Sequence, residues 1–453
     1  MAAVATYAYL RPSTLTPDGL ALATSGGVSG SASAYPRFFT GFLTTPEPAA
    51  IGLLAVAEVA RTRYYQPLNR ASLDPVVTGS RDRLRFESFS GCCGVYARLD
   101  VLPSGLDGET VDHGTTNVDV NPELRQSLAR VGGADPLHLD CGPDALSVST
   151  LDGTVVERKV PLPTRWLRGF AEVQVIASRF DPRLEVGAAE AAAFLRRLPG
   201  ASDRSILWVV PAGRSLRLTS RPVPGAVCAA GAGRLAALRP FARFATVLRA
   251  YGPVVGAGGV APMAAASTWE LETPALRLSL TLSPEPARGF SGEGAVLEAL
   301  AGDDVADDAE LISGLLSWDP TIDVDRLATE AVLPAARIRA ALTHLGTAGR
   351  VGFDVADAAY FHRVLPYDPE RIARLNPRLV GAYHLLESGA VDRSADAAWV
   401  RSGDERYQVR LVDGQAVSCT CAWWARHRGD RGPCKHALAV QMSFRDSTVD
   451  SDA

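Results

Sequence analysis

Five residues able to bind a metal lie within one short stretch near the C-terminal end of the sequence. The segment "CTCAWWARHRGDRGPCKH", residues 419–436, holds three of the seven cysteines and two of the seven histidines. Zinc in proteins takes about four thiolate or imidazole ligands in a tetrahedron. Metal binding is therefore the first interpretation of this segment. The alternatives are a redox-active cysteine pair and a chance cluster that binds no metal.

The spacing predicts that four of these side chains hold one structural zinc ion. Cys419 and Cys421 lie at i and i+2, which would place both sulfurs on the same side of a strand. Residues 422–433 then form a loop long enough to fold back, so that Cys434 and His436 lie at the start of a helix over 433–442. Four ligands leave no position for a catalytic water.

Two other interpretations of the segment remain open. A redox pair favours Cys-x-x-Cys at a helix start, whereas the pair here is Cys-x-Cys on a predicted strand. His427 could replace His436 as the fourth ligand, although its place between Arg426 and Arg428 predicts an exposed loop position.

The pattern Cys-x-Cys, a spacer and Cys-x-His resembles the SWIM-type zinc finger. Cys419, Cys421, Cys434 and His436 match its four ligand positions, and the preceding hairpin and following helix match its ββα layout. "CKHAL" is also typical of the family. The resemblance implies nucleic-acid or protein interaction, and some bacterial SWIM proteins occur alongside MoxR-type AAA+ ATPases and von Willebrand A proteins.

The loop between the ligand pairs is basic and aromatic. Trp423 and Trp424 are adjacent, so on one strand they would face opposite ways and one would be exposed. Arginines beside an exposed tryptophan could contact phosphates and stack on a base. Binding of a protein surface by this loop is an equal alternative to binding of nucleic acid. The simplest interpretation is that the loop is solvated and binds no partner. The basic side chains are Arg426, Arg428, Arg431 and Lys435, against the single acid Asp430.

The elements that must position this site begin with a β pattern. In "WVRSGDERYQVRLVDGQAVSCTC" (399–421), turn signals at 402–405 and at Asp413-Gly414 separate alternating runs. The pattern predicts a three-stranded antiparallel meander, and the finger domain as a whole spans 368–453.

Residues 309–354 predict three short helices followed by a two-stranded hairpin. Asp323 is a candidate N-cap, and Pro334 lies where a third helix would begin. Ile338, Leu342 and Leu345 share one face of that helix. This layout resembles a winged helix and defines a winged-helix-like module over 303–367.

The same module offers candidate partner contacts. Arg337 and Arg339 flank the apolar face of the third helix, and Arg350 lies on the wing. An acidic run at 302–310 would repel DNA if it lay on the same side. Contact with a protein is therefore an equal alternative to contact with DNA.

Residues 1–285 predict a mixed α/β N-terminal region, with a break near 110 as an alternative. Helices are expected over 49–65, 122–131 and 187–200, and a hairpin over 145–160 turns at Asp152-Gly153. A Pro/Gly/Ser-rich linker over 286–302 follows. The fold class is therefore α+β and multidomain.

Composition limits the function. A net charge of −4 and a pI near 6.0 argue against a chain that coats nucleic acid along its whole length. The N-terminus has no signal-peptide pattern, and no run of about 18 apolar residues predicts a membrane span. Seven unevenly spaced cysteines do not form a secreted framework. We expect a protein of the bacterial cytoplasm, because arginine-rich composition indicates GC-rich coding.

An enzymatic role lacks a convincing motif. Cys92 and Cys93 in "GCCG" could be redox-active, and His113 could act as a base, but only if the three converge in a pocket. We therefore predict a non-enzymatic, zinc-containing protein that docks DNA or RNA, without a membrane or small-molecule partner. An adaptor in an AAA+ ATPase complex is the alternative, and an unrecognised enzyme in the N-terminal region is the third interpretation.

Overall fold

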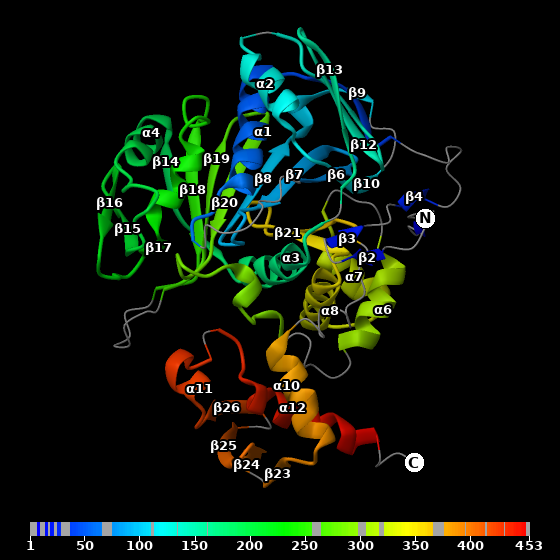
Figure 1. Cartoon of the computed structure of the whole chain (residues 1–453), viewed down its shortest axis with the longest axis vertical. Helices are drawn as coiled ribbons and strands as arrows, with labels where there is room; N and C mark the ends of the chain where they lie inside the picture. Colours follow the sequence, from blue (N-terminus) through cyan, green and yellow to red (C-terminus); the bar gives the residue numbers. More distant parts are fainter. Residues whose placement is uncertain are drawn as a thin grey trace. The chain divides into compact units, whose positions relative to one another are not determined.

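The chain divides into two compact units, each described by itself below. The first comprises Met1–Gly292, Leu316–Asp323 and Gly349–Pro366, and the second Glu293–Leu315, Val324–Ala348 and Tyr367–Ala453. Helices and antiparallel sheets occur in both, which confirms the predicted α+β class (Figure 1). The computed structural model describes the backbone of 7–9, 14–16, 19–21 and 25–28, and the residues 37–65, 75–109, 113–133, 135–160, 162–255, 264–297, 305–316, 321–365, 376–394, 396–412, 415–429 and 431–449.

The first unit is built on a long antiparallel sheet with the order β10-β6-β7-β8-β20-β19-β18-β14. Its central neighbours β8 and β20 are distant in sequence, with Leu99 opposite Leu278. Its strands are β6 (Val76–Ser80), β7 (Arg83–Phe89), β8 (Val95–Val101), β10 (Gly114–Asn117), β14 (Asp181–Gly187), β18 (Val247–Gly252), β19 (Ser267–Glu272) and β20 (Leu276–Leu282).

Further sheets complete the first unit. The hairpin predicted over 145–160 is confirmed as β12 and β13, and Gly153 supplies the positive φ of 125° at its turn. The sheet β13-β12-β11-β5-β9 comprises β5 (Phe39–Leu43), β9 (Leu106–Glu109), β11 (His138–Cys141), β12 (Ala145–Thr150) and β13 (Gly153–Arg158). A three-stranded sheet has the order β16 (Ser215–Thr219), β15 (Ile206–Ala212) and β17 (Val227–Ala230). Two further pairs of strands are described: β1 (Tyr7–Tyr9) pairs with β4 (Ser25–Val28), and β2 (Thr14–Thr16) pairs with β3 (Gly19–Ala21).

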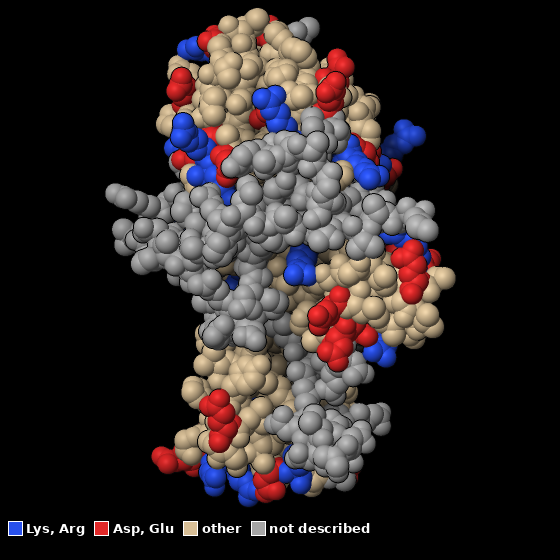
Figure 2. Space-filling model, turned by 90° about the vertical axis from the view of Figure 1, so that its right-hand side faces the viewer, with Lys and Arg blue, Asp and Glu red and all other residues tan. Residues whose placement is uncertain are grey.

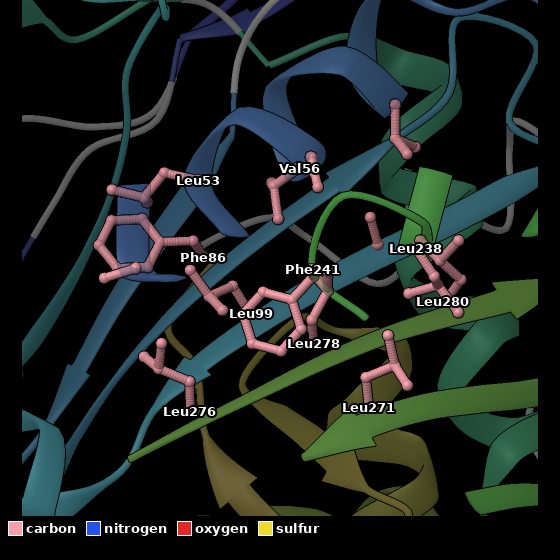
Figure 3. Packing of buried hydrophobic residues seen from close by; sticks show 14 of the residues in the cluster. Leu53, Val56, Phe86, Leu99, Leu238, Phe241, Leu271, Leu276, Leu278 and Leu280 are labelled. Atoms are coloured by element: carbon pink, nitrogen blue, oxygen red, sulfur yellow. The ribbon is translucent and has the colours of Figure 1, made fainter. Parts of the chain in front are cut away.

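The core of the first unit lies between the long sheet and helix α1 (Pro46–Arg61). Leu53 and Val56 of α1 pack with Leu99 and the leucines of β20 (Figure 3). A side chain at Gly52 would meet Leu99 at 2.7 Å, so glycine permits the close approach of helix and sheet. The other helices are α2 (Pro122–Arg130), α3 (Thr164–Ala177) and α4 (Ala188–Arg196), with the short 3-10 turns η1 (Pro103–Gly105), η2 (Ala232–Leu238) and η3 (Phe290–Gly292).

The predicted C-terminal hairpin of the winged-helix-like module belongs to the first unit. Strands β21 (Val351–Asp354) and β22 (Ala359–His362) form it as predicted. Asp354 is buried and lies 2.9 Å from Arg98 and 3.3 Å from Arg277 of the long sheet. Ile322 forms an isolated bridge with Tyr360.

The second unit contains the other elements of that module and the C-terminal domain. The three short helices predicted within 309–347 are confirmed, and Ile338, Leu342 and Leu345 of the third are buried. The helices are α6 (Val305–Leu315), α7 (Val324–Ala331), α8 (Ala335–Thr347), α10 (Pro377–Glu387), α11 (Ala422–His427) and α12 (Lys435–Val449). The predicted module 303–367 thus contributes helices to one unit and its hairpin to the other.

The predicted meander in the second unit is present and is extended by a further strand. Its order is β23 (Val391–Arg393), β24 (Ala397–Ser402), β25 (Glu405–Val412) and β26 (Gln415–Cys419). Alternate residues of β24 and β25 are buried beneath helix α12, because side chains alternate across a strand. The predicted turn at Asp413-Gly414 lies outside the described residues.

Candidate metal centre

The predicted ligands come from the ends of three elements in the second unit. Cys419 is the last residue of β26, and Cys421 is the N-cap of α11, with an extended backbone. Cys434 directly precedes α12, and His436 lies in its first turn. The expectation that Cys419 and Cys421 share one strand is therefore wrong for Cys421, because the strand ends at Cys419 and a helix begins at Ala422.

The four side chains converge as a zinc site requires. Their ligand atoms all lie within 4.8 Å of one another. The Cys419 Sγ lies 3.8 Å from the His436 Nδ1. Sulfur ligands about 2.3 Å from zinc in a tetrahedron are separated by about 3.8 Å. The cluster thus fits one ion after small adjustments, and its donor set of three thiols and one imidazole is typical of structural zinc.

The four predicted ligands are buried, and hydrogen bonds join them. All four residues are buried, with at most 6% of any one exposed. Hydrogen bonds with Cys419 and Cys434 lower the pKa of the Cys421 thiol, so the cluster favours a thiolate at Cys421. The Ala437 amide donates to the Cys434 sulfur at 3.4 Å. When bound, zinc would replace the thiol protons and hold the ends of β26, α11 and α12 together.

Aromatic packing fixes the imidazole. The His436 ring stacks on Tyr407 of β25, with centroids 4.3 Å apart and an interplanar angle of 24°. The short hydrogen bond between the Tyr407 hydroxyl and Glu405 anchors the tyrosine in turn. The histidine is therefore held with its Nδ1 facing the sulfurs.

The segment between the ligand pairs differs from the predicted extended loop. It begins with helix α11, so Trp423 and Trp424 do not alternate as they would on a strand. Trp423 donates its Nε1 hydrogen to the Gly432 carbonyl at 3.3 Å, and Arg378 of α10 stacks on its ring at 4.3 Å. Trp424 is half-buried. Neither indole is an exposed stacking surface of the kind expected.

His427 does not occupy the exposed position expected for it. It is 4% exposed and packs against the Trp423 ring, with centroids 4.4 Å apart. The cluster of metal-ligating atoms found among the described residues contains His436 instead. The reason is helical spacing, since positions i and i+4 lie on one face of α11.

Arg431 was predicted to contact a partner, but in the structure it is buried. It is 5% exposed, and its guanidinium donates to both Glu293 carboxylate oxygens, at 2.9 and 2.7 Å. A buried and paired arginine cannot reach a phosphate without breaking this pair. Arg431 is therefore a structural residue of the second unit.

The remaining predicted contact residues lie at separate places. Arg426 and Arg428 are exposed at the end of α11. Lys435 donates to the Ser402 hydroxyl at 2.8 Å and lines a pocket beside the start of α12. Arg337 is paired with Asp308 by two bonds of 2.7 Å, whereas Arg339 is exposed. Arg350 is exposed and belongs to the first unit.

The candidate redox residues of the first unit lie at opposite ends of one strand. Cys92 and Cys93 follow β7, whereas His113 contacts Arg81, in the turn that precedes β7. A strand of this length spans about 20 Å. Burial raises the pKa of Cys93 to about 12, which suits an inert packed thiol.

The sequence interpretation overlooked the exposed arginines of β24 and β25. Arg401, Arg406 and Arg410 are exposed. The same alternation in "WVRSGDERYQVRL" that predicted the strands would have assigned them to one face. Glu293 could not have been found this way, because its partner Arg431 lies far along the chain.

Comparisons with known proteins bear on the C-terminal domain. No curated protein matches the chain, and none of the described helices is long and apolar enough to cross a membrane. Among solved structures, proliferating cellular nuclear antigen from Entamoeba histolytica aligns with a TM-score of 0.35 and 11% identity, over 55% of this chain and 99% of that one. A TM-score this low supports no argument about fold or function. Residues 407–440, which contain all four predicted zinc ligands, match the family model of the SWIM zinc finger.

Proposed function

We propose that this protein is a non-enzymatic interaction protein whose zinc-stabilised finger docks nucleic acid. The observation that carries the proposal is the exposure of Arg426, on α11, and of Arg428, directly after it, between the two pairs of zinc ligands. Within 415–442 the only acidic residue is Asp430. A guanidinium donates bidentate hydrogen bonds to phosphate, so this surface suits a polyanion.

Zinc would contribute to binding by ordering that surface in advance. Cys421 begins α11, and Cys434 follows the segment that returns from it. Linking these ends through one ion restricts the conformations of the segment before the partner arrives, which reduces the entropy lost on binding. The metal therefore acts on shape and takes no part in a reaction.

The charge distribution limits the proposal to local patches. On the side of the molecule in Figure 2, basic and acidic side chains are interspersed among uncharged ones. A net charge of −4 also disfavours binding over a wide area. We therefore expect few phosphate contacts, and an affinity that falls with salt in proportion to their number.

A protein partner is the second candidate, and helix α6 favours it. Asp308 of α6 is occupied by Arg337, while Asp307, Glu310 and Leu311 are exposed on the same helix. An acidic surface with an exposed leucine suits a protein better than a nucleic acid. Along the chain, α6, α7 and α8 are followed by a hairpin, which is the element order of a winged helix, and we propose this role for the three helices, for example in an AAA+ ATPase complex.

The test uses the full chain and labelled single- and double-stranded DNA and RNA oligonucleotides. Fluorescence anisotropy measured over a salt series should give an affinity that falls as salt rises. Arg426→Glu with Arg428→Glu should weaken binding at least about tenfold. Arg214→Glu with Arg221→Glu, at exposed positions in the first unit, is the matched control and should change it little.

The outcomes separate the two candidates. Absence of salt-dependent binding to all four oligonucleotide types would contradict the nucleic-acid function. Recovery of a defined partner with the wild-type chain, lost on Leu311→Arg, would then support the protein-contact function.

A further inference from the structure

The sheet of the second unit has one face covered by helix α12 and one face open to solvent. Its register places Trp399 opposite Gln408 and Arg401 opposite Arg406. Ala398, Val400 and Val409, which alternate with these residues, are buried. Because side chains alternate across a strand, Trp399 and the arginines share the solvent face.

We propose that this open face binds single-stranded nucleic acid. The inference rests on the proposed function and adds a second contact surface for the bound strand, beside Arg426 and Arg428. The residues of this surface, here called the open-sheet surface, are Trp399, Arg401, Arg406, Gln408 and Arg410.

Trp399 supplies a stacking platform. Its side chain is large and apolar, yet 37% of the residue is exposed. The Arg406 guanidinium lies 4.9 Å from the ring centroid, which holds the indole beside a positive charge. A base stacked on this pair gains both aromatic and cation–π contact, as in open sheets and grooves that bind single strands.

The charges of the open-sheet surface suit a phosphate backbone. Three arginines face solvent, and the acid paired with them is Asp392, 2.9 Å from Arg406. Glu405 is engaged with the hydroxyl of Tyr407, a residue that faces the zinc site. Arg401 and Arg410 therefore keep an excess of positive charge on this face.

A cationic pocket lies at the end of β24, on the side of the sheet that helix α12 covers, and Arg401 is among its lining residues. The pocket has a volume of about 430 Å³. It is lined by residues of α10 and the positions just after it, of the β24–β25 turn and of the start of α12, and none of these lining residues is acidic. Lys435, between two zinc ligands, reaches it and donates to Ser402 at 2.8 Å. The lining residues are Gly381, His384, Leu385, Ser388, Ala390, Arg401, Ser402, Gly403 and Lys435.

The spacing of side chains along β24 defines how a nucleic-acid strand would lie. Arg401 and Trp399 are two residues apart on β24, about 7 Å along the strand. A phosphate held by Arg401 would therefore place an adjacent base near the indole. The bases of a duplex are already stacked on one another, so an exposed ring favours an unpaired base.

The experiment measures the affinity of the full chain for labelled 15-nucleotide single strands, of DNA and of RNA, and for the matching duplexes. Trp399→Ala should weaken binding of single strands by about five- to a hundredfold, the range of one lost stacking contact. Duplex binding should change less than about twofold, and Trp399→Phe should restore most of the affinity. Phe42→Ala, an exposed aromatic on β5 of the first unit, is the matched control.

The salt dependence separates stacking from charge. Arg410→Ala should reduce the slope of log affinity against log salt by about one, whereas Trp399→Ala should leave the slope unchanged. Zinc content measured for each variant verifies that the finger is intact.

Failure of this inference can be told from failure of the proposed function. If Trp399→Ala and Arg410→Ala bind single strands like wild type, while Arg426→Glu with Arg428→Glu does not bind, the open-sheet surface is refuted and the proposed function stands. If the wild-type chain binds no nucleic acid, both are refuted.

Discussion

Arg431 and Glu293 form a buried ion pair with two hydrogen bonds, of 2.9 and 2.7 Å, and about 5% or less of either side chain is exposed. Arg378 donates to the Glu293 and Arg431 carbonyls as well. The zinc finger is thus tied to the segment that precedes helix α6, within one compact unit. The composition of the loop predicted that Arg431 contacts a partner. In the structure Arg431 instead stabilises the second unit.

Removing one member of this pair should destabilise the second unit. Glu293→Gln leaves the Arg431 charge buried without its counter-ion, so we expect a loss of about 3 kcal/mol. The measurement is the urea concentration at which the full chain releases zinc to a chromogenic chelator. Asp392→Asn, which breaks an exposed pair in the same unit, should change the midpoint little. A midpoint unchanged in Glu293→Gln would contradict the structural role of the pair.

One zinc per chain is expected, bound by the four clustered ligands. Cys434→Ala should lose it, because three ligands leave the site open. Elemental analysis of purified protein provides the measurement. Cys228→Ala, at a buried cysteine of the first unit, should retain full zinc content. Wild-type protein that carries no zinc after purification without chelators would show that the site is not a metal centre.

Asp354 should anchor the β21–β22 hairpin to the long sheet through charge. Burial alone would raise the pKa of Asp354, but Arg98, Arg277 and Arg85 hold it well below its ordinary value of 3.8. A carboxylate with a lowered pKa stabilises the fold above the unfolded pKa, and this stability is lost as the pH falls. Asp354→Asn should therefore cost about 3 kcal/mol or more at pH 7.

Urea unfolding of wild type and Asp354→Asn between pH 3 and pH 7 tests this. The difference between the two should shrink on acidification. Asp181→Asn, at an exposed ion pair, is the control. Equal stability of wild type and Asp354→Asn at pH 7 would rule out the anchoring role.

Glu270 should have the opposite pH dependence. Burial raises the pKa of this carboxyl from 4.5 to about 7. A raised pKa contributes stability that is present below pH 4.5 and lost as the pH rises through about 7. Glu270→Gln, which stays neutral, should be more stable than wild type at pH 8, by about 3 kcal/mol at most.

The free energy of unfolding at pH 4, 6 and 8 provides the measurement for Glu270. The gain should be absent at pH 4 and largest at pH 8. Glu272→Gln, at a half-buried position on the same strand, is the matched control for removing a carboxylate. A constant difference across the range would mean that Glu270 is not titrating in the folded protein.

Local spacing was sufficient to predict the zinc ligands and several elements. The ligands lie within eighteen residues, so their convergence depends on one strand end and two helix starts. The helix α8 and the β12–β13 hairpin followed from apolar periodicity and a turn dipeptide, which act over short ranges. The SWIM resemblance rested on the same local residues, and the family match over 407–440 confirms it.

Only the tertiary structure decided which of the basic residues are exposed. Arg431 is buried because Glu293, 138 positions away, meets it, and Arg337 is occupied because Asp308 of another helix does. Trp423 is covered by Arg378 of α10, whereas Trp399 is left exposed on an open sheet face. Charge and residue type determine what a side chain can bind, but only contacts between distant segments determine which side chains remain accessible. The sequence by itself therefore determined the metal centre, and the tertiary structure decided which surfaces that centre leaves for a partner.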